Sequence, residues 1–175
     1  MNAAQCRRLA DGLTVGRAVI GLPLIVVLAA DWNPLAWWLL LLGGLSDAAD
    51  GWLARRAGGG SVWGARLDPL TDKILILAPL LWLGAQQSLP LWAIWLLLAR
   101  ELLISGWRAG QGSGGPASKS GKAKTILQFA SLLLLLWPSS WGPAIAEGLH
   151  NLGFWLFWPS LLLALSSAWG YMRKA

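Results

Sequence analysis

Six apolar runs dominate this 175-residue sequence and are the candidates for the roughly 20-residue helices that cross a bilayer. Only 13% of the residues are charged, about half the share of a typical soluble chain. The runs lie at residues 13–30, 35–47, 69–83, 89–105, 123–137 and 153–169. We therefore expect an all-α, polytopic membrane protein. It would have one domain of six transmembrane helices over residues 13–175, after a short N-terminal interfacial segment over residues 1–12.

The basic residues all lie on one side of these runs. Lys and Arg occur before or within the start of the first run, between the second and third runs or at the start of the third, between the fourth and fifth runs or at their adjoining ends, and after the sixth. The opposite connections, around Asp31, Gln86 and Glu147, contain none. The positive-inside rule then places both termini and the basic connections in the cytoplasm. Asp11 and Arg17 interrupt the apolar stretch that a cleaved signal peptide would need.

Several other classes of protein are disfavoured. The net charge of +6 does not indicate nucleic-acid binding, because the basic residues flank apolar runs instead of forming a stripe. The single cysteine, Cys6, excludes an internal disulfide. Residues 110–115 match G-x-G-x-x-G without a preceding strand, and residues 120–122 resemble a P-loop that lacks its earlier glycine and its Ser/Thr. We expect residues 111–118 to form a glycine-rich cytoplasmic loop.

Four aspartates stand where the chain enters or leaves the predicted membrane region. Asp47 and Asp50 are spaced i, i+3, and Asp68 and Asp72 are spaced i, i+4, so each pair occupies one face of a helix. A short connection makes the two helices antiparallel neighbours. Converging carboxylates repel one another unless cations compensate them, and oxygen-only ligands favour Mg²⁺ or Mn²⁺. The alternative is an interfacial turn in which the aspartates form salt bridges with nearby arginines.

The string that begins at Asp47 reads Asp-x-x-Asp-Gly-x-x-Ala-Arg, eight residues, Gly64, three residues, Asp68, three residues, Asp72. It resembles the CDP-alcohol phosphotransferase family, whose pattern it matches without a gap. In that family, a hydroxyl of an alcohol attacks the lipid-bearing phosphorus of a CDP-linked lipid, and CMP leaves. The resemblance implies that all four aspartates ligate two Mg²⁺ or Mn²⁺ ions. It also implies that Asp72 acts as the general base.

The same resemblance implies a nucleotide pocket made of small, polar and basic residues. Gly51 has no side chain and lets the nucleotide approach the backbone, while Arg55 can pair with phosphate oxygens in a planar fork. Leu-Thr-x-x-Arg at residues 13–17 resembles the family's Asn-x-x-Thr-x-x-Arg element, with Asp11 in place of the usual Asn. The implied nucleotide-binding residues are Thr14, Arg17, Gly51, Arg55, Ser61 and Gly64.

Further matches resemble the phosphatidylglycerophosphate synthase branch of this family. They include Ala-Arg-Glu at residues 99–101 and Gly-Lys-x-Lys-Thr at residues 121–125. That branch implies CDP-diacylglycerol as donor and sn-glycerol 3-phosphate as acceptor, and the acceptor phosphate needs fixed cations. The residues expected to supply them are Lys73, Arg100, Arg108, Lys122 and Lys124. The alternative for this basic cluster is positive-inside topology combined with attraction to anionic headgroups.

Other functions compatible with the pattern differ in acceptor or in class. A cardiolipin synthase of the same family uses phosphatidylglycerol as acceptor, and another relative uses an inositol phosphate. A cation transporter would need acidic residues near the bilayer midplane, whereas these aspartates cluster at one interface. The basic loop favours glycerol 3-phosphate as the acceptor. Membrane lipids are further expected partners, and nucleic acid is not expected to bind. The family commonly forms homodimers, although this sequence defines no interface.

Overall fold

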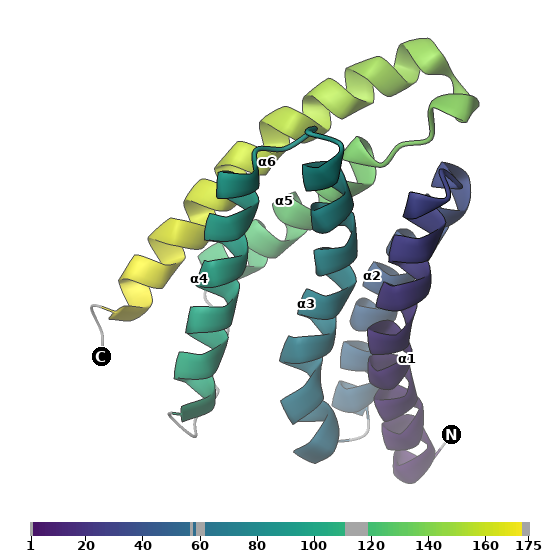
Figure 1. Ribbon diagram of the computed structural model, residues 1–175. Helices are drawn as coiled ribbons and strands as arrows, with labels where there is room; N and C mark the ends of the chain where they lie inside the picture. The colour runs from purple at the N-terminus through teal and green to yellow at the C-terminus, as the bar shows by residue number, and fades with distance from the viewer. Residues whose placement is uncertain (1, 57, 59–61, 111–118, 173–175) are drawn as a thin grey trace. The chain divides into compact units, whose positions relative to one another are not determined.

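The structure, a computed structural model, describes residues 2–56, 58, 62–110 and 119–172. For some helical residues, among them 62–69, 107–110 and 119–122, only the backbone is described. Within these ranges the chain forms six α-helices, one short 3₁₀ helix and no strand (Figure 1). The all-α fold class is therefore confirmed. The loop expected at residues 111–118 lies outside the described residues.

The six helices correspond in order to the six apolar runs. Their bounds are α1 Ala3–Ala29, α2 Asn33–Arg56, α3 Val62–Ala85, α4 Leu91–Gly110, α5 Lys119–Leu135 and α6 Pro143–Met172, with η1 at Ser139–Trp141. The α1 helix begins at Ala3 and continues without a break through residue 12, so residues 3–12 of the expected interfacial segment are helical. The α6 helix begins well before the sixth run, because Glu147 and His150 interrupt the apolar sequence without interrupting the helix.

Two helices are long and apolar enough to cross a membrane, judged over the described part of the chain. They are α1 over Arg8–Ala29 and α6 over Pro143–Ala168. Large apolar side chains also point outward, including Leu22, which is 71% exposed, and Leu103, which is 72% exposed. Water-soluble surfaces rarely expose large contiguous apolar areas. These features suit a membrane protein with at least these two candidate spans.

The chain divides into two compact units, residues 1–82 and residues 83–175. The first unit contains α1, α2 and most of α3, and the second contains the end of α3, α4, α5, η1 and α6. In the first unit α1 and α2 lie side by side, and in the second α5 and α6 do so (Figure 1). The single membrane domain over residues 13–175 stays a prediction.

A tight turn joins α1 to α2. Asp31 has a φ of 59°, and the N–H of Trp32 donates to the carbonyl of Val27 at 3.0 Å. This is the bond pattern that closes a helix through one left-handed residue. Pro34 lies in the first turn of α2, where a backbone N–H has no intrahelical partner to lose. The short connection returns α2 along α1.

Two glycines let α3 approach α1 and α2 closely. A Cβ at Gly21 of α1 would lie 2.9 Å from Cγ2 of Ile74, and a Cβ at Gly43 of α2 would lie 2.7 Å from Cδ2 of Leu75. Small residues permit such close helix contacts in membrane proteins. Because Asp72 lies less than one turn before these contacts on α3, the glycines bring it toward both neighbouring helices.

Gly153 of α6 likewise permits a close contact between two helices of the second unit. A Cβ there would lie 2.9 Å from the backbone nitrogen of Leu135, which cannot rotate away. We expect Gly153→Ala to lower the free energy of unfolding by about 1–3 kcal/mol, measured by thermal unfolding in detergent. Gly148→Ala is the control, because nothing lies within 4 Å of that site on the same helix. The control should be neutral or stabilising by about 1 kcal/mol. Equal stability of the two variants would contradict this packing.

Candidate active site

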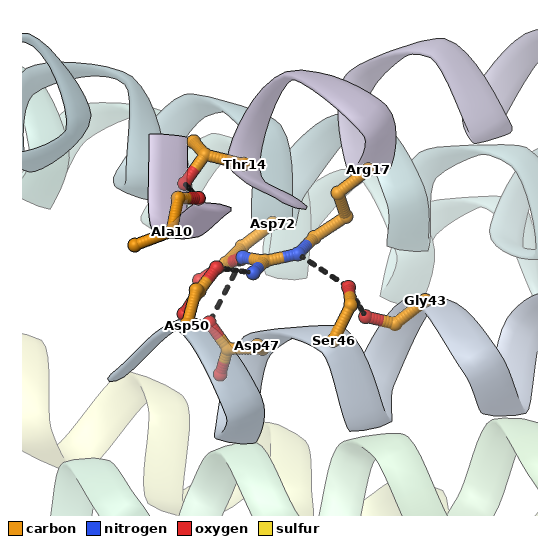
Figure 2. A network of polar contacts seen from close by, with 8 residues as sticks. All are labelled: Ala10, Thr14, Arg17, Gly43, Ser46, Asp47, Asp50 and Asp72. Carbon is orange, nitrogen blue, oxygen red and sulfur yellow. Dashed lines mark hydrogen bonds and ion pairs between the residues drawn. The ribbon is translucent and has the colours of Figure 1, made fainter. Parts of the chain in front are cut away.

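Arg17 of α1 is the centre of a polar cluster in the first unit (Figure 2). Its side chain is fully buried, and its Nη1 donates to Oδ1 of Asp47 at 2.9 Å. The same Nη1 donates to Asp72, and Nη2 donates to Asp50. One arginine from α1 therefore binds two carboxylates from α2 and one from α3. Charged groups within membrane helices characteristically pair in this way and mark functional sites.

Two hydroxyl groups line the same part of α1 and α2. Ser46 Oγ donates to the carbonyl oxygen of Gly43 at 2.6 Å and accepts from Nε of Arg17 at 3.4 Å. Thr14 is buried about one turn before Arg17, and its Oγ1 donates to the carbonyl oxygen of Ala10 at 3.1 Å. Each nitrogen of the guanidinium thus has an oxygen partner on another helix, which fixes the orientation of its plane.

The cluster is closed around the arginine and open at two of its carboxylates. The side chain of Asp50 is 5% exposed, whereas those of Asp47 and Asp72 are 52% and 47% exposed. Three carboxylates surround one guanidinium, so these four side chains together carry a net negative charge. A cation or a hydroxyl group that arrives from the open side meets Asp47 and Asp72 first.

The donor chemistry of the cluster fits a hard divalent cation. Mg²⁺ and Mn²⁺ prefer oxygen ligands, and three carboxylates already converge on one positive group. Asp68 lies about one turn before Asp72 on α3, but its side chain is not described. Among the described side chains, no three Asp, Glu, His or Cys form a ready metal site. The guanidinium of Arg17 stands among the carboxylates instead.

The other predicted residues of this half of the chain are placed to different extents. A Cβ at Gly51 would lie 3.5 Å from Nη1 of Arg55, so the exposed arginine lies beside this glycine. Lys73 is half-buried on α3. Gly64 belongs to α3 by its backbone, and Ser61 lies outside the described residues. Arg17, which was predicted to contact the nucleotide, binds the aspartates in the structure. Its contact with a nucleotide stays a prediction.

The second unit contains its own buried charge network, centred on Glu101. Its Oε1 accepts from Nη1 of Arg100 at 2.8 Å and from Nζ of Lys124. Arg100 also donates from Nε to the carbonyl oxygen of Ala164 at 2.8 Å and from Nη2 to Oγ of Ser167 at 2.5 Å. The network therefore ties α4, α5 and α6 together. All three guanidinium nitrogens of Arg100 already have protein partners.

This network brings together two of the predicted acceptor-phosphate residues. Arg100 and Lys124 meet at Glu101, while Arg108 of α4 and Lys122 of α5 have only their backbones described. Their contact with a phosphate stays a prediction.

Three polar residues of the two networks have no predicted role: Ser46, Glu101 and Ser167. The sequence could have indicated a role for Glu101, because a carboxylate within an apolar run implies a buried cationic partner.

Breaking the Glu101 network should destabilise the second unit. Glu101→Met leaves two cationic side chains without their shared carboxylate, so we expect the free energy of unfolding to fall by about 3–5 kcal/mol. The double variant Glu101→Met/Lys124→Met removes a charge of each sign and should recover part of this loss. Denaturant unfolding in detergent measures both variants. A double variant that is as unstable as the single one would contradict coupling between these two residues.

Comparison with known proteins places the chain in a family. The model of the CDP-alcohol phosphatidyltransferase family matches residues 7–166, a segment that includes all four aspartates. A protein of Mycobacterium tuberculosis, named probable phosphatidylglycerophosphate synthase, is 34% identical over 142 residues. That match covers 80% of this chain and 65% of the relative, so the chain spans less than two thirds of the mycobacterial protein.

Two further relatives bear the name CDP-diacylglycerol–glycerol-3-phosphate 3-phosphatidyltransferase. The protein of Bacillus subtilis is 30% identical over 148 residues, which cover 78% of this chain and 70% of the relative. The protein of Escherichia coli K12 is 32% identical over 163 residues, which cover 87% of this chain and 85% of the relative. The family match and these identities agree with the resemblance of the aspartate string, and the chain belongs to the CDP-alcohol phosphatidyltransferase family.

Proposed function

We propose that this protein transfers a phosphatidyl group from CDP-diacylglycerol to sn-glycerol 3-phosphate, giving phosphatidylglycerophosphate and CMP. The observation that carries the proposal is the convergence of Asp47, Asp50 and Asp72 in one cluster. Family membership supports the reaction class. The names of the relatives from Bacillus subtilis and Escherichia coli support this donor and this acceptor. The protein would thus act in phospholipid biosynthesis.

In the proposed reaction, a hydroxyl oxygen of glycerol 3-phosphate forms a bond to the lipid-bearing phosphorus of the donor. The bond from that phosphorus to the bridging oxygen of the diphosphate breaks, and CMP leaves with that oxygen. Asp72 accepts the hydroxyl proton as general base, a role that suits its half-exposed carboxylate. The four aspartates Asp47, Asp50, Asp68 and Asp72 would hold two Mg²⁺ or Mn²⁺ ions. When bound, such ions stabilise charge on the attacking and leaving oxygens.

Binding of the two substrates is assigned to two sets of residues. The donor nucleotide would contact Thr14, Arg17, Gly51, Arg55, Ser61 and Gly64. The acceptor phosphate would contact Lys73, Arg100, Arg108, Lys122 and Lys124. The exposed guanidinium of Arg55 beside Gly51 supports the first assignment, since a planar fork matches phosphate oxygens. Arg100 and Lys124 of the second set are bonded to Glu101 in the structure, so an acceptor phosphate would have to share these two cations with that carboxylate.

We also propose that all six helices cross the membrane, with both termini and the aspartate cluster at the cytoplasmic face. The one-sided distribution of Lys and Arg supports this topology. The two helices that satisfy the length and composition of a span support the membrane location. A homodimer stays an expectation from the family resemblance.

Release of CMP from CDP-diacylglycerol tests the proposed activity. The purified protein is assayed in detergent with Mg²⁺ or Mn²⁺ and one acceptor at a time: glycerol 3-phosphate, phosphatidylglycerol or inositol phosphate. We expect release with glycerol 3-phosphate alone, and loss of release when EDTA removes divalent cations. Release only with another acceptor would overturn the choice of acceptor while keeping the reaction class. No release with any acceptor would overturn the enzymatic proposal.

The role of Asp72 has a separate test. We expect Asp72→Asn to lower kcat by about a hundredfold or more, because an amide cannot accept the hydroxyl proton. Membrane insertion and elution as a folded species in detergent should be unchanged. Asp31→Asn is the matched control, since Asp31 is exposed in the α1–α2 turn and asparagine tolerates its positive φ. Near-normal turnover by the Asp72 variant would contradict the general-base assignment.

A further inference from the structure

We infer, on the basis of the proposed metal site, that Arg17 is an internal counter-ion of the aspartate cluster. Its guanidinium holds the carboxylates together when no divalent cation is bound, and a divalent cation displaces it. This gives Arg17 a positioning role in addition to its expected contact with the nucleotide. Binding of the cation would then free the guanidinium for the diphosphate of the donor.

The first support is the geometry of the guanidinium. Nη1 bridges Asp47 and Asp72, which belong to two different helices, and Nη2 binds Asp50. The Nε–H points to Ser46 at 3.4 Å. A planar guanidinium directs its donors at the carboxylates in fixed directions, whereas the three donors of an ammonium rotate on a flexible stem. Arg17 therefore occupies the position from which one positive charge contacts all three carboxylates.

The second support is the repulsion that the cluster would feel without this cation. Carboxylates that share one guanidinium are close neighbours, and their repulsion grows as the dielectric constant falls. Asp50 is the critical member, because its side chain is only 5% exposed and water screens it poorly. Removal of one partner from a buried charge pair is strongly destabilising, since the other charge stays buried. A positive charge among these carboxylates therefore stabilises the cluster.

The third support is the conflict between Arg17 and a second cation at the same place. A carboxylate oxygen that accepts from an Nη group directs that lone pair at nitrogen rather than at a metal ion. A divalent cation among the carboxylates would also lie beside a positive guanidinium and be repelled. Asp47 and Asp72 are half-exposed, so exchange of Arg17 for a cation can begin at these two residues.

Mn²⁺ binding and thermal stability test this exchange without measuring turnover. Free Mn²⁺ is quantified by electron paramagnetic resonance, and the melting temperature is measured in EDTA and in excess Mn²⁺. The proteins compared are the wild type, Arg17→Met, Arg17→Lys and the control Arg8→Met. Arg8 is an exposed arginine of the same helix, so its variant removes the same charge away from the cluster.

We expect Arg17→Met to lower the melting temperature in EDTA by about 5 °C or more, because the carboxylates lose their counter-ion. The same variant should bind Mn²⁺ about tenfold or more tightly, because the ion no longer displaces a competing charge. Excess Mn²⁺ should restore much of the lost stability. Arg17→Lys should lie between the wild type and Arg17→Met, since it keeps the charge and loses the fork. Arg8→Met should match the wild type in both measurements.

The outcomes separate this inference from the proposed metal site. Mn²⁺ binding by the wild type, with unchanged or weaker binding by Arg17→Met, would overturn the counter-ion role and keep the metal site. No Mn²⁺ binding by the wild type would overturn the metal site and the counter-ion exchange together. If Arg17→Met fails to fold, Arg17→Lys decides: tighter Mn²⁺ binding supports the exchange, and unchanged or weaker binding overturns it.

Discussion

The first unit depends on the ion pairs between one buried arginine and three aspartates. Like charges from α2 and α3 can come together only if a positive charge lies among them, and Arg17 of α1 supplies it. The close approach of the helices makes the contact sterically possible, since Gly21 and Gly43 leave room for α3. Packing and electrostatics thus require each other. Without the glycines the carboxylates would stay apart, and without the arginine they would repel.

Each of the two units contains a buried charge that is shared by several charges of the opposite sign, and the sign of the shared charge differs between the units. In the first unit one cation is surrounded by anions, and in the second one anion, Glu101, is shared by two cations. In both units the minority charge is deeply buried: the side chain of Arg17 is 0% exposed and that of Glu101 is 11% exposed. Each network therefore has an excess of one sign. The negative excess of the first network lies partly on exposed carboxylates, which suits divalent cations, whereas the two cations of the second network are buried and already bonded to Glu101.

Much of the fold follows from local sequence properties. The apolar runs predicted six helices, and the structure has a helix at each of them within the described residues. The spacing of Asp47 and Asp50 predicted one helical face, and both side chains do bind the same guanidinium. The sixth helix was predicted too short at its N-terminal end. Polar residues precede the apolar run, yet the helix already begins at Pro143. An apolar run indicates contact with lipid or with a protein core. The length of a helix depends instead on its backbone hydrogen bonds, which polar residues do not interrupt.

The sequence by itself determined the helices, the register of the aspartates and the family, because these depend on residue type and on spacings within a turn or a motif. The tertiary structure decided which charges meet. Arg17 finds partners 30, 33 and 55 residues away, and Glu101 finds Lys124 at a separation of 23 residues. Such pairings depend on how closely helices pack and on which faces they present to one another. No periodicity within a single helix specifies them, so the partner of each buried charge becomes known only when the helices are assembled.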